Sequence, residues 1–198
     1  MRFVATSPDQ LSFLLSDREH ELEKLRASLP ILESQLSELK GSTSKSQVLY
    51  YHGKDGLKQV TYNSLKAKGE LLTYELSTMN AFMSHDEAEK LHARFVENKI
   101  HICTLTNATR LESWTNVSAM VEKYWETRQL VPKGNPFKFE ILIYNDVYCT
   151  YRYIGEDIFC IEIHNQELAD MQRQLLEHLW SGAHKFKVLD GRGSAKLT

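Results

Sequence analysis

Leucine recurs along the first forty residues at spacings that alternate between four and three. This 3.5-residue period is typical of the seam of a coiled coil. The other faces of such a helix are polar, so the leucine stripe can be buried only against another helix, and the simplest partner is a second copy of the chain. We therefore predict a dimerising coiled-coil helix over residues 7–40. Its seam consists of Leu11, Leu15, Arg18, Leu22, Leu25, Leu29, Leu32, Leu36 and Leu39.

The start and the interior of this helix carry two recognisable signals. Ser7 and Pro8 predict its start, because Ser is a favoured N-cap and Pro suits the first helical position. Pro30 removes an internal hydrogen bond, but the leucine repeat keeps its phase across it, so we expect a kink rather than a loop. Residues 1–6 read as the remnant of a strand, and residues 41–46 as a flexible linker.

From Gln47 onward the pattern changes to alternating strands and amphipathic helices. Predicted strands over 48–51, 70–76 and 100–106 alternate with predicted helices over 53–68 and 84–98. Ser84 and Glu87 have the spacing of a capping box at the start of the second helix. Strands that alternate with helices in this way predict right-handed crossovers and a parallel sheet.

The second half of the domain predicts an antiparallel addition to that sheet. After a helical or irregular stretch over 115–129, strands are predicted at 137–144, 147–154 and 157–164, the first two joined by a hairpin at Asn145 and Asp146. Asn165 is a suitable cap for a last helix over 166–181. We therefore predict an α/β domain with a mixed sheet over 47–184 and a loosely held tail over 185–198.

The composition of the chain argues against several classes of function. The net charge is −2 and Lys and Arg are spread along the chain, unlike the basic patch of a nucleic-acid-binding domain. There is no apolar signal segment or uninterrupted apolar run of membrane-spanning length, which predicts a cytoplasmic protein with no membrane partner. The cysteines lack metal-ligand spacing, and His85, Glu89 and His92 share a helix without a third indicated histidine or cysteine ligand, so we predict no metal and no cofactor.

Four stretches, in this order and spacing, resemble the TrmB-type sugar-responsive transcriptional regulators: 3–11, 48–57, 94–100 and 128–147. Members of that family carry a winged helix-turn-helix, a coiled-coil linker and a phospholipase D-like effector domain. The resemblance implies the last two parts here, with residues 1–6 as the end of the wing. No winged helix precedes Arg2, so DNA would be bound only through a domain absent from this chain. No room follows Trp180 for the sugar-binding domain of larger members, so sugar specificity is not carried over.

Phospholipase D chemistry requires a His-x-Lys pair followed by an Asp, because His is the nucleophile, Lys holds the phosphate oxygens and Asp orients His. His52 and Lys54 begin this spacing, but Gln59 occupies the position of the Asp, and no other histidine starts the pattern. We therefore predict that the chain is not an enzyme and has no catalytic residue.

A small effector would be expected beyond the carboxyl ends of the parallel strands. The residues there are Tyr51, His52, Ser77, Thr78, Thr106 and Asn107. Two hypotheses remain open at this point. The chain is the effector and dimerisation portion of a TrmB-like regulator, or it is a stand-alone dimeric scaffold or small-molecule sensor with no role at DNA.

Overall fold

The computed structural model describes residues 9–39, 46–130 and 137–198. The chain divides into two compact units, Met1–Ser44 and Lys45–Thr198, and each is considered by itself. The predicted strand remnant at 1–6, the helix start at Ser7 and Pro8, and linker residues 41–45 lie outside the described residues. Within the described ranges, no helix is long and apolar enough to cross a membrane.

The first unit contains one long helix, α1 (Asp9–Leu39), which continues through Pro30. Five seam leucines have described side chains, and all are between 51% and 67% exposed: Leu15, Leu22, Leu25, Leu29 and Leu32. Arg18 forms an ion pair with Glu21 one turn later, at 2.7 Å between Nη1 and Oε2. The side chains of Leu11, Leu36 and Leu39 lie outside the described set. The predicted helix is confirmed, and its apolar seam has no partner within the described part of this chain.

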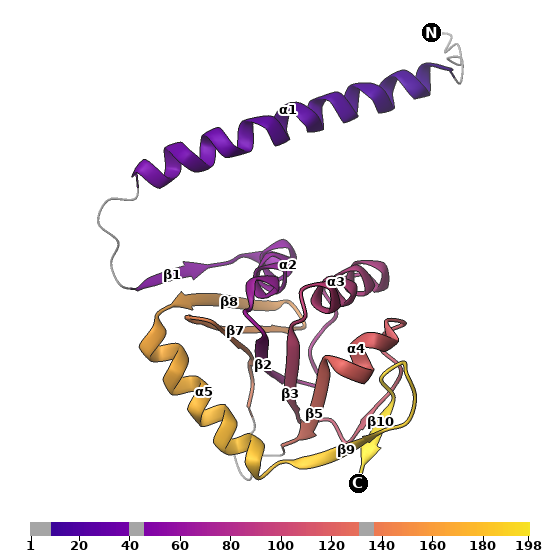
Figure 1. The fold of residues 1–198 in the computed structure, drawn as a ribbon, viewed down its shortest axis with the longest axis vertical. Helices are drawn as coiled ribbons and strands as arrows, with labels where there is room; N and C mark the ends of the chain where they lie inside the picture. The colour runs from indigo at the N-terminus through magenta and orange to yellow at the C-terminus, as the bar shows by residue number, and fades with distance from the viewer. Residues whose placement is uncertain (1–8, 40–45, 131–136) are drawn as a thin grey trace. The chain divides into compact units, whose positions relative to one another are not determined.

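The second unit is built on a ten-stranded mixed sheet (Figure 1). Its strands are β1 (Gln47–Tyr50), β2 (Glu70–Glu75), β3 (His101–Thr106), β4 (Arg110–Leu111), β5 (Trp125–Gln129), β6 (Glu140–Tyr144), β7 (Val147–Ile154), β8 (Asp157–His164), β9 (His184–Val188) and β10 (Ala195–Leu197). They lie in the order β1-β8-β7-β6-β2-β3-β5-β9-β10-β4. β2 pairs in parallel with β3, and β3 with β5, whereas β6, β7 and β8 form an antiparallel meander. The predicted α/β class with a mixed sheet is confirmed.

Helices cover both faces of the sheet (Figure 1). One apolar core includes Leu57 and Val60 of α2 (Gly53–Asn63), Phe95 of α3 (His85–Glu97) and Met120 of α4 (Ser118–Lys123). The other core contains Leu176 of α5 (Gln166–Ser181). A 3-10 turn, η1 (Ser64–Lys66), extends α2. Because side chains alternate along a strand, β2 serves both cores: Leu71 faces the first and Leu72 the second.

Local signals in the sequence predicted several boundaries. Ser84 and Glu87 form the predicted capping box at the start of α3. Asn145 adopts a φ of 47° in the hairpin between β6 and β7, a conformation that asparagine tolerates. The side chain of Asn165 accepts a hydrogen bond from the backbone N–H of Leu168 and caps α5 as predicted.

The predicted place of the first strand was wrong. β1 is not a parallel neighbour of β2 but pairs antiparallel with β8 at the far edge, with β8, β7 and β6 between it and β2. The reason is burial: β6 is buried along most of its length and occupies the edge of β2, whereas β1 exposes Val48 and Tyr50. A strand with so little buried surface fits only an outer position.

Two other stretches were also predicted wrongly. Residues 115–129 contain the short α4 and then β5, a central strand. This strand was not recognised in the sequence because its buried residues Thr127 and Gln129 are polar. Residues 185–198 are not a loose tail, because β9 pairs with β5 and with β10. Their Lys-rich alternation reads as solvent-exposed, yet the backbone of these residues covers an edge of the sheet that β5 would otherwise leave open.

Candidate functional site: a cavity under three helices

A cavity of about 520 Å³ lies on the face of the sheet that α2, α3 and α4 cover. Its floor consists of side chains that alternate along β2, β3, β5 and β6. Deep in the cavity they are apolar, as at Leu71, Ile102 and Leu142, and toward the carboxyl ends of the parallel strands they become polar. The cavity therefore lies at the end of the sheet where α/β folds bind ligands.

Three threonines in register form a row across the floor. Thr73 of β2 is paired with Thr104 of β3, which is paired in turn with Thr127 of β5. Thr73 Oγ1 lies 3.0 Å from Thr104 Oγ1, within hydrogen-bonding distance. Thr127 Oγ1 is buried and has no hydrogen-bond partner in the described structure. Because an unpaired buried hydroxyl is costly, this oxygen is available to a bound molecule.

Two glutamates, Glu75 and Glu140, also line the cavity. Glu75 is accessible to solvent. Glu140 is 6% exposed, and its Oε1 accepts a hydrogen bond from the backbone N–H of Leu76 at 2.8 Å. Burial raises the pKa of Glu75, and burial together with the charge of Glu75 raises the pKa of Glu140 to about 8.

The walls of the cavity are mostly aromatic and aliphatic. Phe95 of α3 and Met120 of α4 close it from above, and Tyr151 of β7 lies beside Glu140. The Trp114 ring packs against Trp125 and against His92, at centroid distances of 5.1 and 4.8 Å. A compact molecule with an apolar body would therefore be desolvated here.

The trio His85, Glu89 and His92 anchors a loop to α3. Glu89 Oε2 accepts from the backbone N–H of Asn116 at 2.8 Å, and the ring nitrogens of His92 and His85 lie 3.1 Å from Thr115 Oγ1 and 3.3 Å from Asn116 Nδ2. Burial lowers the pKa of His92. The described residues contain no group of three or more His, Cys, Asp or Glu that could hold a metal ion.

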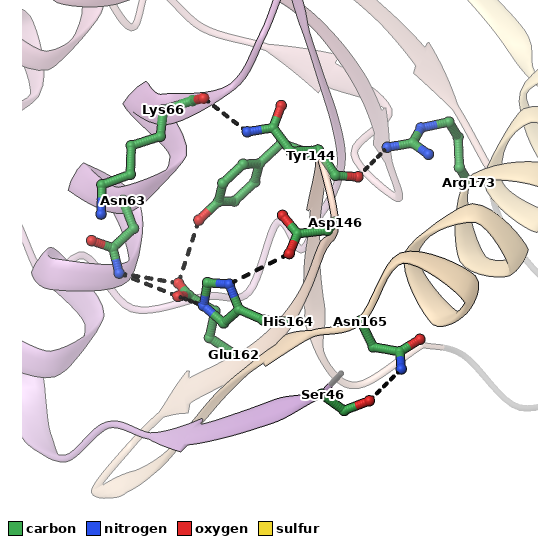
Figure 2. Close-up of polar contacts among 10 residues, drawn as sticks. Ser46, Asn63, Lys66, Tyr144, Asp146, Glu162, His164, Asn165 and Arg173 are labelled. Carbon is green, nitrogen blue, oxygen red and sulfur yellow. Dashed lines mark hydrogen bonds and ion pairs between the residues drawn. The ribbon is translucent and has the colours of Figure 1, made fainter. Parts of the chain in front are cut away.

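A second buried polar cluster lies away from the cavity, centred on Glu162 of β8 (Figure 2). Asn63 Nδ2 lies 3.1 Å from Glu162 Oε2, and His164 Nε2 lies 2.8 Å from Glu162 Oε1. Tyr144 donates from its hydroxyl at 3.4 Å, and Asp146 lies 4.0 Å from the other ring nitrogen of His164. These contacts satisfy a buried carboxylate with protein groups, which is the pattern of a structural tie.

The predicted effector residues fall into two places. Ser77 and Thr106 line the cavity, and Asn107 Oδ1 accepts a hydrogen bond from the backbone N–H of Ser77 at 2.8 Å. Thr78 follows Ser77 but does not line the cavity.

Tyr51 and His52 do not join that group, because three strands separate β1 from β2. The Tyr51 hydroxyl accepts a hydrogen bond from Asn63, and the His52 ring contacts Tyr50 at 4.8 Å. Lys54 lies over the ring of Tyr153, at 5.4 Å from its centroid. His52 and Lys54, which form the incomplete His-x-Lys pair, therefore contact aromatic rings outside the cavity.

The sequence interpretation missed Glu75, Glu140 and Thr127. Glu75 is the last residue of a strand, where a ligand group is expected, but it reads there as the polar end of an apolar run. Glu140 and Thr127 required the knowledge that β5 and β6 flank the parallel pair.

No family model matches the sequence, and no curated protein matches it either. Among solved structures, the phospholipase D family member Nuc from Salmonella typhimurium is 10% identical over 72% of this chain and 99% of its own, with a TM-score of 0.52. NucT from Helicobacter pylori is 8% identical over 71% and 98%, with a TM-score of 0.51. The archaeal chromatin protein TrmBL2 is 16% identical over 93% and 72%, with a TM-score of 0.45. The globular unit of this chain therefore has the fold of the phospholipase D family.

Proposed function

We propose that this chain is the dimerisation and effector portion of a cytoplasmic TrmB-like transcriptional regulator, and that its phospholipase D-like domain binds a small molecule without hydrolysing it. The sequence stretches that resemble the TrmB-type regulators support the family. Contact with DNA would come from a domain outside this chain.

The observation that carries the proposal is the exposed seam of α1. Five leucines spaced for a coiled coil lie more than half exposed on one helix, together with other exposed apolar residues such as Phe13 and Ile31. Full burial of each leucine is worth about 1.5–3 kcal/mol before the cost of association. A second copy of α1 offers the complementary surface, so a parallel pair would hold two effector domains at a fixed spacing along the DNA.

The residues of the cavity support binding rather than hydrolysis. Among its described lining residues the only histidine is His92, and lysine is absent. His92 Nδ1 contacts Thr115 Oγ1 and Glu89 Oε1, and among the described lining residues no lysine accompanies it to hold phosphate oxygens.

Light scattering on the purified chain at micromolar concentration tests the dimer, and a monomer would contradict the proposal. Hydrolysis of bis(p-nitrophenyl) phosphate tests the absence of catalysis. We expect no turnover above buffer, and turnover that disappears in either His52→Ala or His92→Ala would show an active phosphodiesterase.

The cavity alone equally favours a stand-alone dimeric sensor with no role at DNA. The genomic sequence immediately upstream of Met1 separates the two functions. An in-frame winged helix supports the regulator, whereas an unrelated intergenic region favours the sensor.

A further inference from the structure

Among the described residues, no cation pairs with the two glutamates of the cavity. Glu75 accepts one hydrogen bond in the described structure, from Thr73 Oγ1 at 3.4 Å, and no nearby cation lowers its pKa or that of Glu140. The described lining contains one Arg, Arg110, which is mostly exposed and pairs with Glu112 at 2.9 Å. Within the described residues the two carboxyl groups therefore lack an opposite charge, and each makes ionisation of the other harder.

Two neighbouring carboxyl groups without an opposite charge are costly to ionise, and the pKa of each is raised. The cost falls when a ligand supplies the positive charge. The orphan oxygen of Thr127 lies on the same floor, one strand beyond Thr104, and can accept a hydrogen bond from a ligand N–H. Two independent observations, the unpaired acids and the unpaired hydroxyl, thus favour a ligand that donates hydrogen bonds and is cationic.

The rest of the cavity sets the size and the body of that ligand. Its volume of about 520 Å³ lies within the range of small-molecule sites, roughly 300–1,000 Å³. Phe95, Trp114, Trp125 and Tyr151 contribute aromatic rings to the lining of the same cavity. Aromatic faces attract both apolar groups and cations, so an amine carried on an apolar skeleton matches floor and walls together.

We propose that this cavity binds a small organic cation, a protonated amine on an apolar or aromatic skeleton, with its charged nitrogen beside Glu75 and Glu140 and with the hydroxyl of Thr127, two strands from Glu75, open to a second hydrogen-bond donor on the skeleton. This inference rests on the proposed role of the cavity as the effector site and names its ligand class. The same floor repels anionic ligands such as phosphate esters and sugar acids. A neutral polyol would satisfy the threonines but would leave both glutamates without an opposite charge.

The experiment uses the full chain and calorimetric titration with three matched probe pairs, each an amine and the alcohol of the same skeleton. The pairs are hexylamine and hexanol, phenethylamine and phenethyl alcohol, and tryptamine and tryptophol. We expect at least one amine to bind at least tenfold more tightly than its alcohol. No preference for the amine in any pair would overturn the inference.

Variants locate the binding. Glu75→Gln, which removes the charge with little change of shape, should weaken the best amine by tenfold or more, and Thr127→Val should weaken it severalfold. Glu97→Gln removes an exposed carboxylate of α3 outside the cavity and is the matched control. Unchanged amine affinity in Glu75→Gln, with a normal thermal melt, would also overturn the proposal.

Light scattering on the same samples separates this inference from the proposed function. A dimer that prefers alcohols or binds none of the probes contradicts only the ligand class. A monomer contradicts the dimerising regulator, whatever the cavity binds.

Discussion

Asn63, the last residue of α2, donates a hydrogen bond from Nδ2 to Oε2 of Glu162 in β8 over 3.1 Å (Figure 2). Glu162 is 2% exposed, so its carboxylate depends on protein donors in place of water. The same amide also lies 3.0 Å from the Tyr51 hydroxyl, at the end of β1. One side chain therefore holds an edge strand, a helix and an interior strand together.

Replacement of this amide should be costly. Asn63→Ala leaves a buried carboxylate short of a donor, and we expect the free energy of unfolding to fall by about 1–3 kcal/mol. Urea denaturation measures it. Asn80→Ala, which removes an exposed hydrogen bond to the carbonyl of Gly155, is the control and should cost less than half as much. Equal losses in the two variants would show that Glu162 does not depend on Asn63.

The stability of the α/β domain should fall as the pH rises toward 9. The pKa of Glu140 is about 8 in the folded chain, well above the value of about 4.3 of an unfolded glutamate, so the folded state binds more protons between these values. The stabilising contribution of the protonated group is complete below about pH 4 and is lost as the pH rises through 8.

Glu140→Gln should therefore have a higher melting temperature than the unchanged chain at pH 9, with the difference shrinking toward pH 5. Thermal melts followed by circular dichroism across this range provide the measurement. The exposed carboxylate of Glu97 gives the control variant, Glu97→Gln. A difference between Glu140→Gln and the unchanged chain that stays constant with pH would mean that Glu140 does not titrate in this range.

Gly193 should tolerate no side chain. Its φ is +86°, and a Cβ at this position would overlap the indole nitrogen of Trp114. We expect Gly193→Ala to lower the melting temperature by several degrees, because it combines backbone strain with displacement of a cavity wall. Gly155→Ala is the matched control: its φ is also positive, at +62°, but the space around it is open. If both variants lose the same stability, backbone strain alone is responsible.

Disruption of the α1 seam should separate the proposed dimer. Leu25→Asp places a charge in the proposed helix interface, and we expect light scattering to report a monomer. Ala27→Asp introduces the same residue on an exposed position outside the seam and should leave the dimer intact. A dimer that survives Leu25→Asp would place the interface elsewhere.

Arg18 occupies a seam position where leucine is otherwise used, and its ion pair with Glu21 is exposed on both sides. Exposed ion pairs contribute little to stability, so Arg18→Leu should lose little by removing the pair with Glu21. The new leucine should add apolar surface that is buried in the proposed helix interface. We expect the melting temperature of the dimer to rise. An unchanged or lower value would argue against the assigned register of the seam.

The sequence predicted the helices and strands of this fold better than it predicted which strands lie next to each other in the sheet. The capping box at Ser84, the hairpin at Asn145 and the cap at Asn165 were predictable because each signal lies within a few residues. The position of β1 in the sheet was not predictable from such signals. It depends on which strand pairs with β2, and that strand, β6, comes much later in the sequence.

The same limit applies to the cavity. Ser77 and Thr106 were expected at a ligand site from their places at strand ends, whereas Glu140 comes from a strand whose position in the sheet was unknown. Thr127 and Gln129 were misread because a polar buried strand resembles a loop in sequence; these residues are buried because they face a cavity or pair with neighbours.

The C-terminal hairpin of β9 and β10 bears directly on the cavity. The backbone N–H of Trp114 donates to the carbonyl of Arg192 at 3.0 Å, Ser113 and Ser194 lie 2.9 Å apart at their hydroxyl oxygens, and β10 pairs with β4. Removal of residues from 184 onward would thus strip the outer support from a tryptophan that walls the ligand space. A truncation made to tidy the chain for crystallisation would change what it binds, and purification tags belong at the other end.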